Sequence, residues 1–138
     1  MFRSISSLLI SAAVVALPAA AVAQAADTAP PDAPFAKVSE LVTLPDFLPG
    51  LGTLYVDPAT LPAGPFLGYD RDGRLSATIY MIPLEALAGG TAHDDLGVGA
   101  QTVTSTDIYY NAGHPGVEVP HAHVVLYHDA DAKTRLAE

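Results

Sequence analysis

The stretch "GPFLGYDRDGRLSATIYMIP", residues 64 to 83, gives the clearest indication of the fold class. Two runs rich in apolar and β-branched residues flank Asp70-Arg71-Asp72-Gly73, whose residue types tolerate the tight backbone geometry of a turn. The pattern therefore predicts a β-hairpin. In the second run, both sets of alternating side chains are largely apolar, which predicts a strand covered on both of its faces.

Further strands are predicted on both sides of this hairpin. Residues 53–56, 102–110 and 121–128 are each rich in β-branched, aromatic or aliphatic side chains. Pro83 favours one short helix directly after the hairpin. Because the sequence contains no repeat and no long amphipathic helix, we expect a mostly β fold. The specific prediction is a small antiparallel sandwich or barrel with at most one short helix.

The N-terminal residues have the pattern of a secretory signal peptide. Arg3 provides a short positive region, the run 12–23 carries no charge, and small residues satisfy the A-x-A cleavage rule at 21–23 and 23–25. A membrane anchor is the alternative, but the strongly apolar part is short for a span of about 20 residues, and Pro18 interrupts it. We therefore predict export to the periplasm or the medium, with no stable membrane insertion after cleavage.

The remainder of the chain is predicted to form one domain. Residues 24–37 are rich in alanine and proline, which is typical of a flexible segment. The residues that follow are numerous enough for one hydrophobic core. The predicted organisation is thus a signal peptide at 1–23, a flexible Ala/Pro-rich leader at 24–37 and a single β-rich domain at 38–138.

The composition argues against several classes of partner. The chain has 15 acidic and 6 basic residues and a formal net charge of −9, whereas nucleic acids and anionic membrane surfaces attract lysine and arginine. It has no cysteine, so stability must come from the core, a metal or oligomerisation. The apolar residues on both faces of the strand at 76–82 favour a homo-oligomer, because a chain of this size cannot easily bury them all.

Four of the five histidines lie between residues 114 and 128. In an extended strand, alternate side chains share a face, so His121 and His123 point the same way. The opposite face carries Ala122, Val124 and Leu126, which we expect to be the core side. His128 falls on that opposite face. His114 lies in the preceding loop, where Gly113, Pro115 and Gly116 should let the chain fold back towards the pair.

Three neutral imidazoles form the ligand set of an open zinc-type site, in which water takes the fourth position. We therefore predict a divalent transition metal bound by His114, His121 and His123. Zinc and copper are the first candidates, although imidazole also suits iron and nickel. Glu118 or Asp107 could add an oxygen ligand or orient a ligand histidine.

A second hypothesis belongs to a different class. The histidines can pack and hydrogen-bond beside tyrosines at a subunit interface, in a structural or interaction domain without enzymatic activity. Whether the protein is an enzyme stays open, because the serines lie in no nucleophile elbow and the glycine pairs lack the lysine of a phosphate-binding loop. His93, in a separate glycine-rich loop, is expected to be solvated.

Two resemblances to known families add to these predictions. The stretches "LPGLGTLYVDPATLPAGPFLGYD", "IYMIPLE", "DIYYNAGHPG" and "PHAHVVLYH" resemble a family of small exported bacterial proteins that is described only as a domain of unknown function. This resemblance implies export and a β-rich fold, and it implies no catalytic residues. His121-Ala122-His123 also resembles the H-x-H of the cupin metal motif. Gly116 lies one position too close for that motif, and Tyr127 or His128 stands where its glutamate should be.

Overall fold

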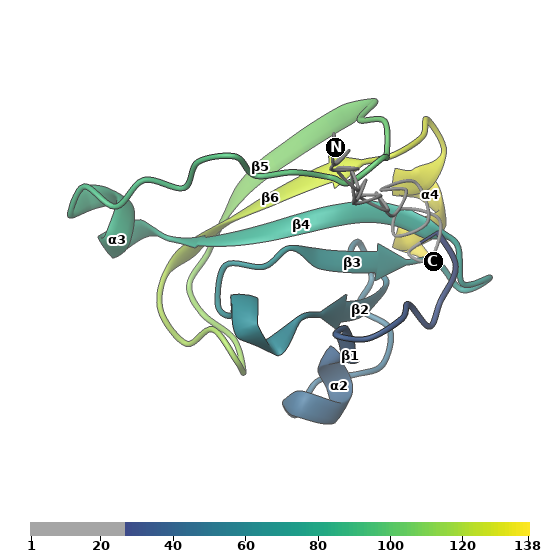
Figure 1. Ribbon diagram of the computed structural model, residues 1–138, viewed down its shortest axis with the longest axis horizontal. Coiled ribbons are helices and arrows are strands. Elements are labelled where there is room, and N and C mark those ends of the chain that lie inside the picture. Colours follow the sequence, from purple (N-terminus) through teal and green to yellow (C-terminus); the bar gives the residue numbers. More distant parts are fainter. Residues whose placement is uncertain (1–26) are drawn as a thin grey trace, which may run out of the picture.

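The computed structural model describes residues 27–138, and within them it forms one antiparallel sheet of six strands (Figure 1). The predicted signal peptide lies outside these residues. The strand order is β1-β2-β3-β4-β6-β5. The strands are β1 (Ala36–Lys37), β2 (Thr53–Val56), β3 (Phe66–Tyr69), β4 (Leu75–Pro83), β5 (Ser105–Asn111) and β6 (His121–Tyr127). The two edge strands β1 and β5 do not pair, so the sheet is open.

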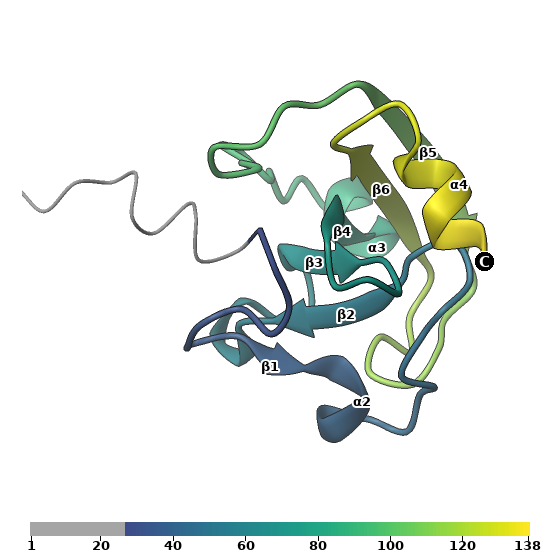
Figure 2. The same ribbon diagram turned by 90° about the vertical axis from the view of Figure 1, so that its right-hand side faces the viewer.

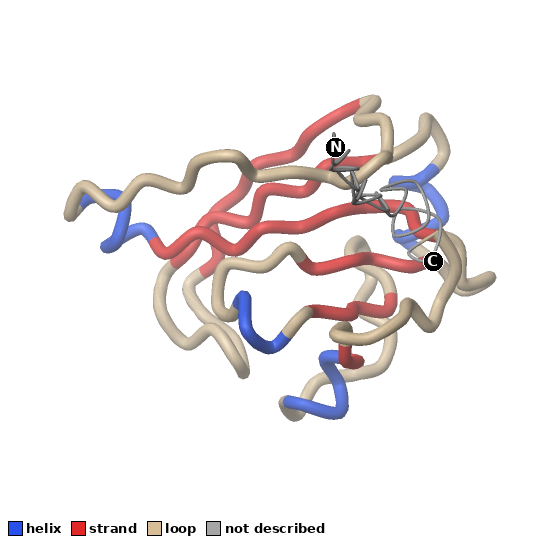
Figure 3. Tube along the Cα trace, viewed as in Figure 1, coloured by secondary structure: helices blue, strands red, loops and turns tan. Residues whose placement is uncertain are grey.

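The helices are all short, as Figure 3 makes plain. They are α2 (Val38–Leu41), the 3-10 helix η1 (Pro58–Thr60), α3 (Leu84–Ala88) and α4 (Ala132–Ala137). The prediction of a mostly β fold is confirmed, and α3 begins where Pro83 indicated. The part of the chain that the structure describes has three short α-helices, whereas we expected at most one. No helix within residues 27–138 is both long and apolar enough to cross a membrane.

The predicted hairpin is confirmed as β3 and β4. Phe66 pairs with Ile79, and the register shifts at Gly68 and Tyr69. In the turn, the Asp70 carboxylate accepts hydrogen bonds from the backbone N–H groups of Asp72 (3.0 Å) and Arg74 (2.9 Å), which fixes the backbone between the strands. Residues 75–82 of β4 are all buried, so this strand is covered on both faces as its apolar pattern predicted.

Two apolar clusters lie on the two faces of the sheet. In Figure 2, α4 lies on one side of the sheet and residues 27–35 lie on the other. The larger cluster contains residues from the strands β2, β3, β4 and β6, together with residues of α2 and α4. The smaller cluster joins Leu67, Tyr69 and Leu75 to Ala29 and Phe35. Part of the segment predicted as a leader thus packs on the domain, where the Leu75 N–H also donates to the Asp27 carbonyl (3.0 Å).

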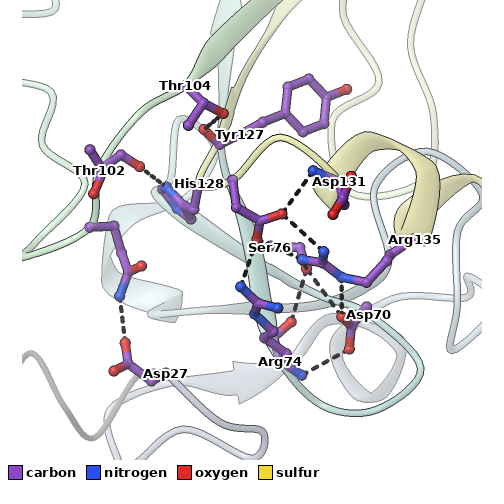
Figure 4. Close-up of polar contacts among 12 residues, drawn as sticks. Asp27, Asp70, Arg74, Ser76, Thr102, Thr104, Tyr127, His128, Asp131 and Arg135 are labelled. Atoms are coloured by element: carbon purple, nitrogen blue, oxygen red, sulfur yellow. Dashed lines mark hydrogen bonds and ion pairs between the residues drawn. The ribbon is translucent and has the colours of Figure 1, made fainter.

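A polar network fastens α4 to the hairpin turn (Figure 4). Arg135 donates to the carboxylates of Asp70 (2.7 Å) and Asp129 (2.7 and 2.9 Å) and to the hydroxyl of Ser76 (3.0 Å). Its hydrogen bonds hold the pKa of Asp129 at about 2. Leu136 is completely buried beside this network. A half-buried charge with several partners and one buried apolar side chain therefore hold a helix of only six residues in place.

His128 follows β6 and is buried on the face of the sheet opposite to His121 and His123, near the same network. Its Nδ1 atom donates to the Thr102 carbonyl at 2.8 Å (Figure 4). Its Nε2 atom lies 2.9 Å from the Thr78 hydroxyl. Because Nδ1 carries the proton, a neutral ring accepts the threonine hydrogen bond at Nε2. Burial lowers the pKa of His128. His128 therefore has a packing role on the face opposite to His121 and His123.

Candidate metal centre

Strand β6 buries its histidine face. His121 and His123 share a face with Val125 and Tyr127, and all four side chains are buried, whereas the intervening residues are half-buried. The expectation that Ala122, Val124 and Leu126 face the main core is therefore wrong. Hydropathy favoured the aliphatic face, but Nδ1 of each buried histidine has an oxygen partner, which lowers the penalty for burying the ring.

The neighbouring strand places two further polar residues beside the pair. In the antiparallel register of β5 and β6, Tyr109 lies opposite His123 and Asn111 lies opposite His121. Residues directly opposite in such a ladder share a face of the sheet. The Tyr109 hydroxyl accordingly lies 3.1 Å from Nδ1 of His123.

A four-residue turn positions His114. The N–H of each of His114 and Val117 donates to the carbonyl of the other, both at 3.0 Å. Pro115 and Gly116 occupy the centre of the turn. Gly116 has a φ of +91°, and a turn with a positive φ at this position favours glycine there. Val117 is buried in the main core and anchors the turn there. The local sequence His-Pro-Gly-Val thus folds the loop back over β6, as predicted.

The three histidines form one compact group. The ring centroids of His114 and His121 are 4.9 Å apart, those of His114 and His123 are 5.6 Å apart, and those of His121 and His123 are 4.8 Å apart. One ligand nitrogen from each residue lies within 4.8 Å of the others, close enough to hold a metal ion. The Nε2 atoms of His121 and His123 are 2.9 Å apart. The structure therefore brings together all three residues that the sequence selected.

Each ring has an oxygen partner at Nδ1. Nδ1 of His121 donates to the Val119 carbonyl at 2.7 Å, and Nδ1 of His114 donates to the Pro115 carbonyl at 3.0 Å. A carbonyl can only accept, so in the neutral ring the lone pair of each histidine lies on Nε2. The Tyr109 hydroxyl can accept from Nδ1 of His123 in the same way. All three Nε2 atoms can then act as ligands while oxygen atoms orient the rings.

The protonation state of His123 also suits metal binding. Burial, followed by the proximity of His121 and His114, lowers the pKa of His123 to about 4. The ring is therefore neutral at physiological pH. Neutral imidazole is the form that binds a metal.

The two carboxylates that we considered as oxygen ligands do not join the group. Asp107 pairs with Lys133 (2.5 Å) and accepts from the Tyr127 hydroxyl (3.4 Å). Glu118 is exposed and is not one of the clustered residues. The candidate centre thus consists of three nitrogen donors. His93 lies apart from it. Its side chain is half-buried and its Nε2 atom has no hydrogen-bond partner, so this residue is less solvated than we expected.

A cavity of about 310 Å³ lies beside the histidine group, and two members of that group, His114 and His123, form part of the cavity wall. Most of the remaining wall is aliphatic. Sequence reasoning found neither the cavity nor the polar residues Tyr109 and Asn111 in its wall. Alternation along residues 107–111 does place these two side chains on one face, but the order of the strands was needed to show which neighbour they meet.

These features define a small antiparallel β-protein with a three-histidine centre beside an apolar cavity. The structure is similar to the crystal structure of hypothetical protein TTHB210 from Thermus thermophilus, with a TM-score of 0.59 and 40% sequence identity. The match covers 68% of this chain and 88% of the Thermus chain. The chain therefore belongs to the same family as that protein. No protein-family model matches the sequence, and no curated protein does.

Proposed function

We propose that this protein binds a divalent transition metal, zinc or copper, through Nε2 of His114, His121 and His123. One observation carries the proposal: the three histidines form one compact group, and the Nδ1 atom of each lies within hydrogen-bond distance of an oxygen atom, which leaves Nε2 of each ring as the candidate ligand. Metal-binding histidines almost always have such a partner on their second nitrogen. A group of histidines that merely fills space has no need for the same pattern at all three rings.

The spacing of the nitrogens agrees with this ligand set. Two imidazoles on a tetrahedral zinc, each about 2.0–2.1 Å from the metal, have nitrogens roughly 3.3 Å apart. The Nε2 atoms of His121 and His123, at 2.9 Å, need to separate by only a fraction of an ångström. His114 is half-buried and comes from a loop, so its ring can adjust to complete the set.

Three protein ligands leave a position for water or another molecule. Zinc in such a site lowers the pKa of bound water to about 7 and can polarise a carbonyl group. The centre is therefore compatible with both metal handling and a metal-assisted reaction. Our proposal is metal binding, in the periplasm or outside the cell, as the features of residues 1–25 indicate.

Elemental analysis provides the first test. The purified protein is incubated with Zn²⁺ or Cu²⁺, passed through a desalting column and analysed for bound metal. We expect about one metal ion per chain, and we expect a chelator to lower the melting temperature of the metal-loaded protein. A protein that retains no metal, and whose stability a chelator leaves unchanged, would exclude the proposal.

A second candidate function, a homo-oligomeric interaction domain, is supported by the exposed residues of β5. Ile108 is 70% exposed and Tyr110 is 63% exposed, although both are large and lie on a strand. β5 is also an edge strand, whose free backbone groups can pair with another chain. Light scattering at micromolar concentration tests this candidate: we expect an oligomer that Ile108→Lys dissociates, and a wild-type monomer would exclude it.

A further inference from the structure

We infer that the protein binds a small monocarboxylic acid with an apolar body, whose carboxylate completes the metal coordination while its body fills the adjoining cavity. This inference rests on the proposed metal binding and names the chemical class of the ligand. It follows from the position of the cavity, its lining and its size.

The cavity has one polar end and an otherwise apolar wall. His114 and His123 lie at the polar end with Tyr109 and Asn111, and the rest of the wall comes mainly from α2, the segment after it, and the inner faces of β2, β3 and β4. Figure 2 shows α2 close to the loop that carries His114. Leu54, Val56, Phe66 and Met81 form the buried floor. An occupant must therefore be apolar along most of its length and polar where it meets the histidines.

The volume sets an approximate size for the occupant. An apolar cavity of about 150 Å³ in a protein interior can hold benzene. The cavity beside the histidines, at about 310 Å³, has room for such a ring together with a head group, or for a short alkyl chain. Benzoate and octanoate are probes of suitable size. Acetate has the same head group but cannot fill the cavity.

A carboxylate is the head group that the polar end suits best. The side-chain oxygen Oδ1 of Asn111 already accepts from the Gly113 N–H (2.8 Å), so the side-chain NH₂ group of Asn111 is left as a donor. When Tyr109 accepts from Nδ1 of His123, its own proton is likewise available to donate. One carboxylate oxygen can bind the metal and the other can accept these hydrogen bonds. An ammonium head could neither bind the metal nor use the two donors.

Binding of the acid must depend on the metal. None of the described residues that line the cavity is lysine, arginine, aspartate or glutamate, so no side chain there can pair with an anion. The net charge of the chain, −9, also repels anions. A divalent metal supplies the missing positive charge. Leu41 (43% exposed) and Leu61 (45% exposed) belong to the same wall, and this gives an apolar ligand a route from solvent.

The test uses purified protein loaded with Co²⁺, whose visible absorption changes when its coordination changes. Titration with benzoate or octanoate should give saturable spectral changes, with at least tenfold tighter binding than acetate. In the metal-free protein, calorimetry should detect no benzoate binding. Leu44→Phe, which enlarges a half-buried residue of the cavity wall, should weaken benzoate binding at least tenfold and leave Co²⁺ affinity unchanged. Leu61→Trp, at the exposed part of the wall, should have the same effect if Leu44→Phe fails to fold.

Leu87→Phe is the matched control, because Leu87 is exposed on α3 and does not line the cavity. It should bind benzoate as the wild type does. If Co²⁺ binds but benzoate binds no better than acetate, or if Leu44→Phe and Leu61→Trp both leave benzoate binding unchanged, the inference is wrong and the metal site stands. If Co²⁺ itself does not bind, the inference and the proposed function both fail.

Discussion

Tyr109 and His123 lie opposite each other on β5 and β6, and the Tyr109 hydroxyl is 3.1 Å from Nδ1 of His123. Their rings also contact, with centroids 5.0 Å apart. The tyrosine thus links an edge strand of the sheet to a metal-ligand candidate. It can fix the orientation of the imidazole whose Nε2 faces the centre.

Removing this hydroxyl should weaken metal binding without unfolding the protein. We expect Tyr109→Phe to lower zinc affinity about 10-fold or more, because outer partners of ligand histidines typically contribute that much. Tyr110→Phe is the control, since Tyr110 is exposed and points to the other face of β5. Calorimetric titration measures both variants. Equal zinc affinities for the two variants would show that Tyr109 does not orient His123.

The stability of the metal-free protein should decrease as the pH falls below about 6.5. An unfolded histidine has a pKa near 6.5, whereas the pKa of His123 in the fold is about 4 and that of His128 is also lowered. The unfolded chain therefore takes up protons first, which favours unfolding. For His123, the total loss is roughly 3 kcal/mol, and most of it has occurred by pH 4. Urea denaturation between pH 7.5 and 4 measures it, and a flat profile would contradict the burial of neutral histidines.

The network around Arg135 should contribute much more to stability than an exposed ion pair. Arg135→Ala leaves the buried Asp70 carboxylate without its cation, and we expect a loss of about 2–4 kcal/mol in the free energy of unfolding. Lys133→Ala, on the same helix, removes the more exposed pair with Asp107 and a cation–π contact with Tyr127, and should cost about 1 kcal/mol or less. Urea denaturation of both variants provides the comparison. Equal losses would show that α4 is not held by the network.

Export of the chain can be tested directly. When the protein is expressed with its native N-terminus, the A-x-A sites predict removal of residues 1–23, or of up to about 25 residues. Mass spectrometry of the exported fraction measures the new N-terminus. An uncut chain in that fraction would favour a membrane anchor instead.

Local patterns in the sequence were enough to predict the strands and the hairpin. The turn at Asp70 to Gly73 stabilises itself through contacts between residues at most four positions apart, so its residue types alone indicate it. The His-Pro-Gly-Val turn is equally local, and this is why His114 could be placed near His121 and His123. Each prediction needed only residues that are close in the sequence.

The features that were missed depend on distant partners. α4 has few apolar residues of its own, and Arg135 holds it through Asp70, 65 positions earlier in the chain. The buried face of β6 could not be identified because the oxygen partner of the His123 Nδ1 atom, Tyr109, comes from another strand. The cavity depends on α2, the loop at 112–120 and the sheet together. None of these relationships appears in a local pattern.

The most direct test of the account is a calorimetric titration of Zn²⁺ into the wild type and the variants His121→Ala, His123→Ala and His93→Ala. We expect one tight site in the wild type and in His93→Ala, because His93 lies outside the group of three. We expect no tight site in His121→Ala or His123→Ala, because each keeps only two imidazole donors. Equal zinc binding by His93→Ala and His123→Ala would contradict the proposed centre.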